Sequence, residues 1–296
     1  MPDELLAARA DDGSVAVVAG ITTELVRDAQ ARHGLAPTAS ATLGRLLTAA
    51  ALLGTGLKGR ERLTLQIAAD GPIGSVVADA FLVSEREIGV RGLVQHPLVD
   101  LPLNEWGKFD VAGAVGSGRL QVTRSYEVGQ PYVGVVPLAS GEIGEDVAAY
   151  LHDSEQIPSV VALGVLADPN GIAAAGGAIA QVLPGADQAA ISALEQRAQT
   201  VAPLTRQIVG GADPEALVAS LVGAAGFRRL ETYTVRFVCR CTREKVELAL
   251  LGLGRDELDK MVRERESTEA VCDFCNRRYL LSSEEIAHLV TRLNER

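Results

Sequence analysis

The feature that most constrains this chain is the confinement of its cysteines to one short C-terminal stretch. The 296 residues contain four cysteines, and all of them lie between positions 239 and 275. They form a C-x-C pair and a C-x-x-C pair, which are separated by residues 242–271. Two close pairs at a distance are typical of a four-ligand metal site. The sequence therefore predicts such a site on Cys239, Cys241, Cys272 and Cys275.

Zinc is the metal that suits these thiols best, because it prefers tetrahedral thiolate coordination with Zn–S bonds of about 2.3 Å. A tight turn brings the first and fourth residues of C-x-x-C within about 7 Å of each other. An iron–sulfur cluster is the main alternative, but the sequence lacks the usual C-x2-C-x2-C and C-x4-C-x2-C runs. Structural disulfides are uncommon in cytosolic proteins. We expect one Zn²⁺ per chain in the reduced form.

The same spacing permits oxidation of the thiols. Two residues of slightly bent chain, or one tight turn, bring Cα atoms into the disulfide range of about 4.4–6.8 Å. Each close pair can therefore close on itself. Such a reaction removes two ligands at once and releases the metal.

Composition and charge exclude several classes of protein. The formal net charge is −10, whereas nucleic-acid-binding proteins usually carry a basic face. The 5 Phe, 5 Tyr and 1 Trp form no cluster on which bases could stack. Apolar runs such as TAAALLGTGL are shorter than the roughly 20 residues that span a bilayer. The start, MPDELLAARADD, is acidic where a signal peptide would be basic. We expect a cytoplasmic protein that binds neither nucleic acid nor a membrane.

The first part of the chain is rich in strand patterns. Helical patterns are fewer, and the one that begins at Thr22 should be capped by that residue and end at Gly34. Strands largely in runs with few helices between them indicate an α+β fold, here a core domain over residues 1–185. The expected strands cover 15–19, 63–67, 76–81, 88–94, 119–125, 132–136, 160–166 and 172–183, and the expected helices cover 22–34, 38–54 and 143–153.

Residues 186–227 change character and predict short amphipathic helices joined by Gly and Pro. One of them is capped by Asp213 and has Pro214 at its first position. Residues 228–296 predict a small α+β domain with a strand at 233–237, helices from Thr242 to Leu251 and over 255–265, a hairpin around 272–275, and a last helix that starts at Ser282 or Ser283. Domains of this size often need a metal or disulfides to fold.

The chain resembles the heat shock protein 33 family, the redox-regulated holdase chaperones of bacteria. The C-x-C…C-x-x-C pattern at the C-terminus is the most specific feature. Four further stretches resemble the family and extend the similarity over nearly the whole chain. They are GLKGRERLTLQIAADGPIGSVVADA (56–80), VRGLVQHP (90–97), YLHDSEQIPS (150–159) and AAGGAIAQVLPGA (174–186).

The resemblance implies three parts: a core, a helical linker and a zinc-binding C-terminal domain. It implies that the reduced, zinc-bound form is inactive and that peroxide or hypochlorous acid joins Cys239 to Cys241 and Cys272 to Cys275. Release of zinc then unfolds the small domain and loosens the linker. The activated protein, commonly a homodimer, holds unfolding clients without ATP and passes them to ATP-driven chaperones. The resemblance implies no enzymatic activity.

Energetics support such a switch. Structural zinc contributes on the order of 10–16 kcal/mol to the folding of small domains, whereas a whole domain is stable by only ~5–15 kcal/mol. Loss of the metal should therefore unfold the C-terminal domain. If the linker helices pack against that domain, their apolar faces lose a partner too, and the newly exposed surface is what a holdase requires. Our hypothesis is that clients bind the apolar linker side chains, namely Ile191, Leu194, Val201, Leu204, Ile208, Leu217, Val218 and Leu221.

Two other functions fit the C-terminal part alone. One is a zinc-ribbon nucleic-acid or translation-associated factor. The formal net charge of −10 argues against this function. The other is a thiol oxidoreductase that uses C-x-x-C catalytically. That motif usually lies at a helix start near a βαβ unit, whereas here it is expected in a hairpin.

Overall fold

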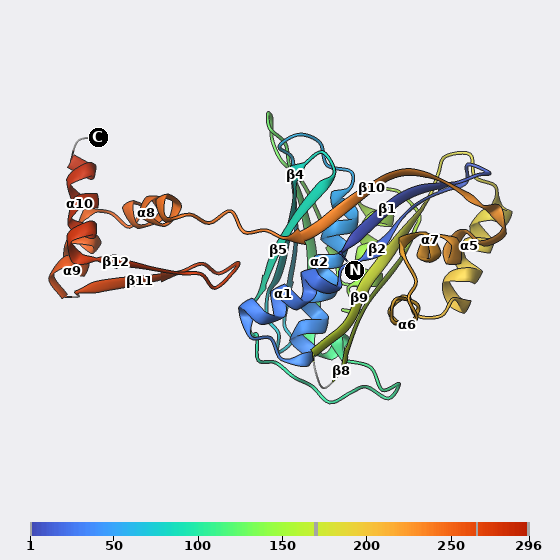
Figure 1. Cartoon of the computed structure of the whole chain (residues 1–296), viewed down its shortest axis with the longest axis horizontal. Helices are drawn as coiled ribbons and strands as arrows, with labels where there is room; N and C mark the ends of the chain where they lie inside the picture. The colour runs from blue at the N-terminus through green and yellow to red at the C-terminus, as the bar shows by residue number, and fades with distance from the viewer. Residues whose placement is uncertain (1, 169–170, 265, 295–296) are drawn as a thin grey trace. The chain divides into compact units, whose positions relative to one another are not determined.

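The computed structural model describes residues 2–168, 171–264 and 266–294 (Figure 1). The chain forms two compact units, Met1–Val238 and Cys239–Arg296. Both units mix helices with antiparallel strands, which confirms the predicted α+β class. Among the described residues, no helix is long and apolar enough to span a membrane.

The first unit is built on a ten-stranded sheet with the order β7-β6-β3-β4-β5-β10-β1-β2-β9-β8. Every neighbouring pair is antiparallel except β10 and β5. Its strands are β1 (Glu4–Ala10), β2 (Val15–Ile21), β3 (Arg62–Ala69), β4 (Val76–Ser84), β5 (Glu87–Val94), β6 (Gly118–Ser125), β7 (Tyr132–Pro137), β8 (Ser159–Asp168), β9 (Gly171–Val182) and β10 (Phe227–Phe237).

One face of the sheet wraps around a central apolar helix, α2 (Pro37–Gly54). This helix contacts β4 and β5 in one half of the sheet and β8 and β9 in the other, and it is buried over nearly its whole length. Pro37 is its first residue, one position before the expected start at 38, and its missing N–H leaves no intrahelical bond unmade there. The same unit contains α1 (Thr23–His33), α3 (Val111–Val115) and α4 (Gly144–Asp153).

The opposite face of β1, β2 and β9 is covered by the helices of the predicted linker. These are α5 (Gln188–Thr200), α6 (Leu204–Val209) and α7 (Pro214–Val222), followed by the 3-10 turn Gly223–Ala225. Asp213 caps α7 by accepting a 2.8 Å hydrogen bond from the amide of Ala216, as predicted. Leu194, Leu204 and Leu217 join one apolar cluster with side chains of β1, β2 and β9.

The cap of α1 differs from the expectation. The Thr22 side chain makes no cap hydrogen bond and instead pairs with the Thr48 hydroxyl. The buried carboxylate of Asp3, remote in sequence, accepts the amides of Glu24 and Leu25 at 3.0 and 2.6 Å. The predicted stop is confirmed, since Gly34 ends the helix with φ 61°, a conformation that side-chain-bearing residues disfavour.

The second unit contains α8 (Arg243–Leu251), α9 (Arg255–Glu264), the hairpin β11 (Ser267–Val271) and β12 (Arg278–Ser282), and α10 (Ser283–Asn294). Thr242 caps α8 through a 3.3 Å bond from the amide of Lys245. Ser282 caps α10 in a reciprocal pair with Glu285, which decides between the two predicted serines. A small apolar cluster joins these elements; its buried members are Leu250, Leu258, Leu281, Ile286, Leu289 and Val290.

The strand before the first cysteine pair lies in the large sheet. β10 pairs with β1 on one side and with β5 on the other. The compact units therefore divide between Val238 and Cys239, later than the expected start of the C-terminal domain at residue 228.

Candidate metal centre

The four cysteines come from two irregular segments of the second unit. Cys239 and Cys241 lie between the end of β10 and the start of α8, where the chain has left the sheet. Cys272 and Cys275 lie in the turn that joins β11 to β12. In a regular strand, the side chains of residues i and i+2 point to the same face but stay apart. The irregular backbone here lets the two sulfurs of the C-x-C pair approach each other.

The turn around the second pair is closed by backbone hydrogen bonds. The amides of Cys275 and Asn276 donate to the carbonyl of Cys272 at 3.2 and 2.8 Å, and the amide of Cys272 donates to the carbonyl of Arg277 at 3.0 Å. Asn276 takes a positive φ of 54°, which asparagine tolerates better than most residues. The turn therefore holds both sulfurs on one side of the hairpin.

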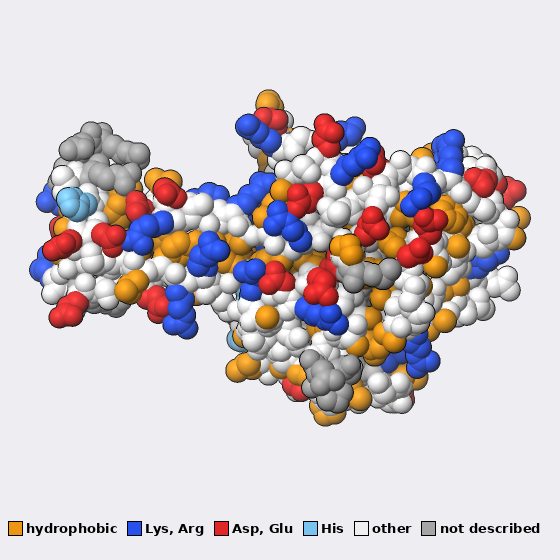
Figure 2. All heavy atoms as spheres, in the orientation of Figure 1, with side chains coloured by type: hydrophobic (Ala, Val, Ile, Leu, Met, Phe, Trp, Pro, Cys, Tyr) orange, Lys and Arg blue, Asp and Glu red, His pale blue; other side chains and the backbone are white. Residues whose placement is uncertain are grey.

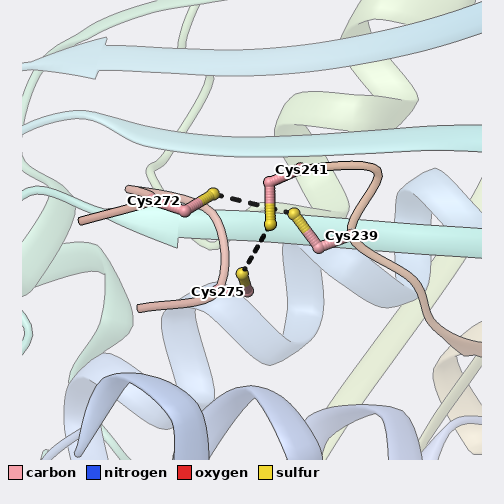
Figure 3. A group of neighbouring side chains, drawn as sticks. All are labelled: Cys239, Cys241, Cys272 and Cys275. Carbon is pink, nitrogen blue, oxygen red and sulfur yellow. Dashed lines mark hydrogen bonds between the residues drawn. The ribbon is translucent and has the colours of Figure 1, made fainter. Parts of the chain in front are cut away.

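The four Sγ atoms lie within 4.8 Å of one another (Figure 3). The Cys239–Cys272 and Cys241–Cys275 separations are 3.7 and 3.4 Å. Both are far longer than the about 2.05 Å of a disulfide bond. A tetrahedral ion with bonds of about 2.3 Å would set its sulfur ligands about 3.8 Å apart. The sulfurs thus fit a single four-coordinate ion, and the sequence prediction that these residues form one cluster is confirmed.

The thiols differ in acidity. The pKa of Cys241 is lowered from an ordinary 9 to about 7. Burial alone would raise this pKa, but hydrogen bonds to the sulfur outweigh burial. The strongest of these hydrogen bonds is donated by the Tyr279 hydroxyl, and the others come from the neighbouring thiols. Burial raises the pKa of Cys275 to about 12, although a hydrogen bond from the backbone N–H of Arg277 acts to lower it. Burial also raises the pKa of Cys272. Of Cys241, Cys272 and Cys275, Cys241 therefore has the lowest pKa.

The acidity of the second pair also bears on the oxidoreductase alternative. Catalytic C-x-x-C motifs carry a thiol whose pKa is depressed, commonly at a helix N-terminus. Here Cys272 and Cys275 lie in a hairpin turn and their pKa values are raised. The nucleic-acid alternative gains no support from the formal net charge of −10, and Figure 2 shows acidic and basic side chains interspersed on the face in view.

Sequence reasoning missed one polar neighbour of the cluster. The Tyr279 hydroxyl on β12 donates a 3.2 Å hydrogen bond to the sulfur of Cys241. In the sequence, Tyr279 is marked only by its position four residues after Cys275. That spacing does not show whether the tyrosine donates a hydrogen bond to a sulfur or packs as an ordinary aromatic residue of the core.

The predicted client-binding side chains lie in the first unit and are covered. Leu194, Leu204, Leu217, Val218 and Leu221 are buried. Ile191, Val201 and Ile208 are half-buried. Ile191 lines a cavity of about 420 Å³ beneath α5, with Ala148 and Val160 among its other walls.

Comparison with known proteins places the chain in a family. The model of the family described as Hsp33 protein matches residues 3–282. The 33 kDa chaperonin of Bacillus subtilis (strain 168) is 45% identical over 289 residues, which cover 97% of this chain and 98% of the relative. The 33 kDa chaperonin of Bacillus licheniformis is 46% identical over the same shares.

A solved structure agrees with the sequence comparison. The crystal structure of the 33 kDa chaperonin of Thermotoga maritima, a heat shock protein 33 homologue, superposes with a TM-score of 0.91 at 37% identity and covers 100% of both chains. The chain therefore belongs to the Hsp33 family of chaperones.

Proposed function

We propose that this chaperone holds one Zn²⁺ on Cys239, Cys241, Cys272 and Cys275 when reduced and is activated by their oxidation. The observation that carries the proposal is the convergence of four sulfurs within 4.8 Å of one another. An all-thiolate set of four suits zinc, a borderline-soft ion, better than the oxygen-preferring Mg²⁺ or Ca²⁺. When bound, zinc keeps its ligands as thiolates and ties the C-x-C segment to the hairpin turn.

Oxidation by peroxide follows from the same thiolates. One sulfur attacks an oxygen of hydrogen peroxide, the O–O bond breaks, and a water molecule leaves to give a sulfenic acid. The neighbouring thiol then attacks that sulfur, the S–O bond breaks, and a second water leaves as the disulfide forms. Two thiols lose two electrons in total, and one peroxide becomes two waters.

We assign the disulfides to Cys239–Cys241 and Cys272–Cys275. The Sγ–Sγ distances of 3.7 and 3.4 Å fit a tetrahedral cluster and select no disulfide pairing. Short sequence separation supports the assignment, because each close pair can reach disulfide geometry through a local backbone change. Two such bonds withdraw all four sulfurs from the metal.

The linker supplies the surface for clients in this proposal. Residues 186–227 form the regulated segment that follows the core at 1–185. The chain then returns to the core sheet as β10, so the switch unit begins at Cys239 rather than at residue 228. Five of its eight proposed client-binding side chains are buried against the core sheet. Burying a Leu or Val side chain stabilises by about 1.5–3 kcal/mol, so release of the linker bares apolar area on the helices and on β1, β2 and β9 together.

Membership of the Hsp33 family supports a proposal for the wider cellular role. We propose that the activated protein binds unfolding clients as a homodimer in the cytoplasm, without ATP and without catalysis. ATP-dependent refolding chaperones would then receive the clients.

One assay tests the function. Light scattering of a heat-denaturing client is followed with reduced and with peroxide-treated protein while a chromogenic chelator reports zinc release. Suppression only after oxidation, in step with release of one zinc per chain, is expected. The metal-free variant Cys275→Ser should suppress scattering without oxidant. Equal suppression by the reduced and oxidised wild-type protein would refute the switch. Turnover of a disulfide substrate would favour the oxidoreductase, and salt-sensitive nucleic-acid binding would favour the zinc-ribbon reading.

A further inference from the structure

Tyr279 is held rigidly beside the sulfur cluster. It lies on β12, where it pairs with Ala270 of β11. Its ring packs against the apolar cluster of the second unit, and its hydroxyl lies 3.2 Å from the sulfur of Cys241 as donor. The hydroxyl is therefore a positioned donor.

The donors to the sulfurs are of two kinds. Backbone N–H groups of Phe274 and Arg277 serve Cys272 and Cys275, and the hairpin turn fixes them. Cys241 instead receives a side-chain hydroxyl from the neighbouring strand. Hydrogen bonds to ligand atoms tune both the affinity of a metal site and the electron density on its ligands. At Cys241 that tuning depends on one replaceable oxygen atom.

We propose that Tyr279 is a positioning residue that sets how readily the cluster reacts with peroxide. This inference rests on the proposed redox function. Its O–H withdraws electron density from the Cys241 thiolate and so lowers its nucleophilicity towards the O–O bond. The same bond orients Cys241 towards the other three sulfurs. Loss of the hydroxyl leaves a more reactive sulfur and a looser metal site, so the protein would be activated at lower peroxide.

The chemistry of the step itself is unchanged. The Cys241 sulfur donates an electron pair to one peroxide oxygen, the O–O bond breaks, and the departing oxygen takes up protons to leave as water. Cys239 then displaces the oxygen bound to Cys241 as a second water and forms the S–S bond. Tyr279 keeps its proton throughout and acts only through the hydrogen bond.

The variant Tyr279→Phe removes the oxygen and keeps the ring that packs on the core cluster. Removal of a partner next to a metal ligand typically costs about 10–100-fold in metal affinity. We expect the zinc dissociation constant to rise by roughly tenfold. We expect the second-order rate of peroxide-driven zinc release to rise by a larger factor than this, since hydrogen bonds to charged groups are the strong ones and the sulfur also becomes more nucleophilic. Tyr126→Phe is the matched control, because Tyr126 is 43% exposed in the first unit, and it should behave as wild type.

A second readout separates tuning from loosening. Zinc release to a chelator without oxidant reports the hold on the metal alone. A rise in the peroxide-driven rate larger than the rise in the chelator-driven rate supports the proposal. Equal rises would show a merely structural role and would overturn it, as would a variant that matches wild type in both. If Tyr279→Phe folds poorly, 3-fluorotyrosine at position 279 is the alternative variant. It keeps the shape of the side chain and donates a stronger hydrogen bond, so it should slow the reaction with peroxide. An unchanged rate would count against the proposal.

Failure here is distinguishable from failure of the redox function. Wild-type protein that carries no zinc, or keeps it under peroxide, refutes the proposed function. Wild-type protein that releases zinc on oxidation, beside an unaltered Tyr279→Phe variant, refutes only the role of Tyr279.

Discussion

Leu217→Ala should activate this chaperone without oxidation. Leu217 is fully buried in α7, where it joins the apolar cluster formed with β1, β2 and β9. Replacing a buried Leu by Ala costs about 2–5 kcal/mol. A loss of about 3 kcal/mol in the docking of the linker raises the ratio of open to closed linker about 150-fold, since each 1.4 kcal/mol is a factor of ten.

Hydrogen exchange on the reduced, metal-loaded protein measures this opening. Amides of residues 215–222 should exchange about 100-fold faster than in wild type, while those of β4 in the core keep their protection. The same sample should suppress aggregation of a heat-denaturing client in the absence of peroxide. Val209→Ala is the matched control in the same linker, because Val209 is 60% exposed, and such surface changes stay within about 0.5 kcal/mol.

Two results would refute the reasoning. Wild-type protection of α7 in Leu217→Ala would show that the linker is not held by this contact. An open linker without suppression of aggregation would show that the surface it covers does not bind clients.

Two further predictions concern the core. Burial raises the pKa of Asp3 from 3.8 to about 6. Between these pH values the folded chain keeps a proton on Asp3 that the unfolded chain loses. The contribution of Asp3 to the free energy of unfolding is therefore complete below pH 3.8 and falls by about 3 kcal/mol as pH rises through 6. Asp3→Asn should abolish this fall in the free energy of unfolding. Urea denaturation of the wild type and the variant from pH 4 to 7 measures it, and the same pH dependence in both proteins would contradict the prediction. Asp79, fully buried, accepts bonds from Arg62, Arg91 and Thr64. Asp79→Ala should lower the free energy of unfolding by about 3 kcal/mol, the low end for a broken buried pair because the Arg62 side chain is 42% exposed and can rehydrate; an unchanged denaturation midpoint would contradict this.

Local signals in the sequence predicted the cluster and most elements. Cysteine spacing predicted the sulfur cluster because the ligand geometry of metal sites restricts such spacings to a few patterns. Alternation located β3 through Leu63, Leu65 and Ile67, whose side chains are buried while the residues between them are less so. The caps Asp213 and Thr242 act within their own turns, so neighbouring residues suffice to predict them.

Features that depend on distant contacts were not predictable in this way. β1 escaped prediction because Leu5 and Leu6 are both buried, and a strand covered on both faces loses its alternation. The Asp3 cap depends on a contact across 21 positions of sequence. The placement of β10 between β5 and β1 follows from sheet pairing, and a strand pattern alone does not reveal its partners.

Native mass spectrometry of the purified, reduced chain, combined with amide exchange of α8–α10 before and after peroxide, shows whether bonds from sulfur to zinc hold the second unit in its fold. We expect one zinc ion per chain at the start, its loss as two disulfides form, and loss of amide protection in the second unit. A reduced protein without metal, or a second unit that stays protected after the ion has gone, would contradict it.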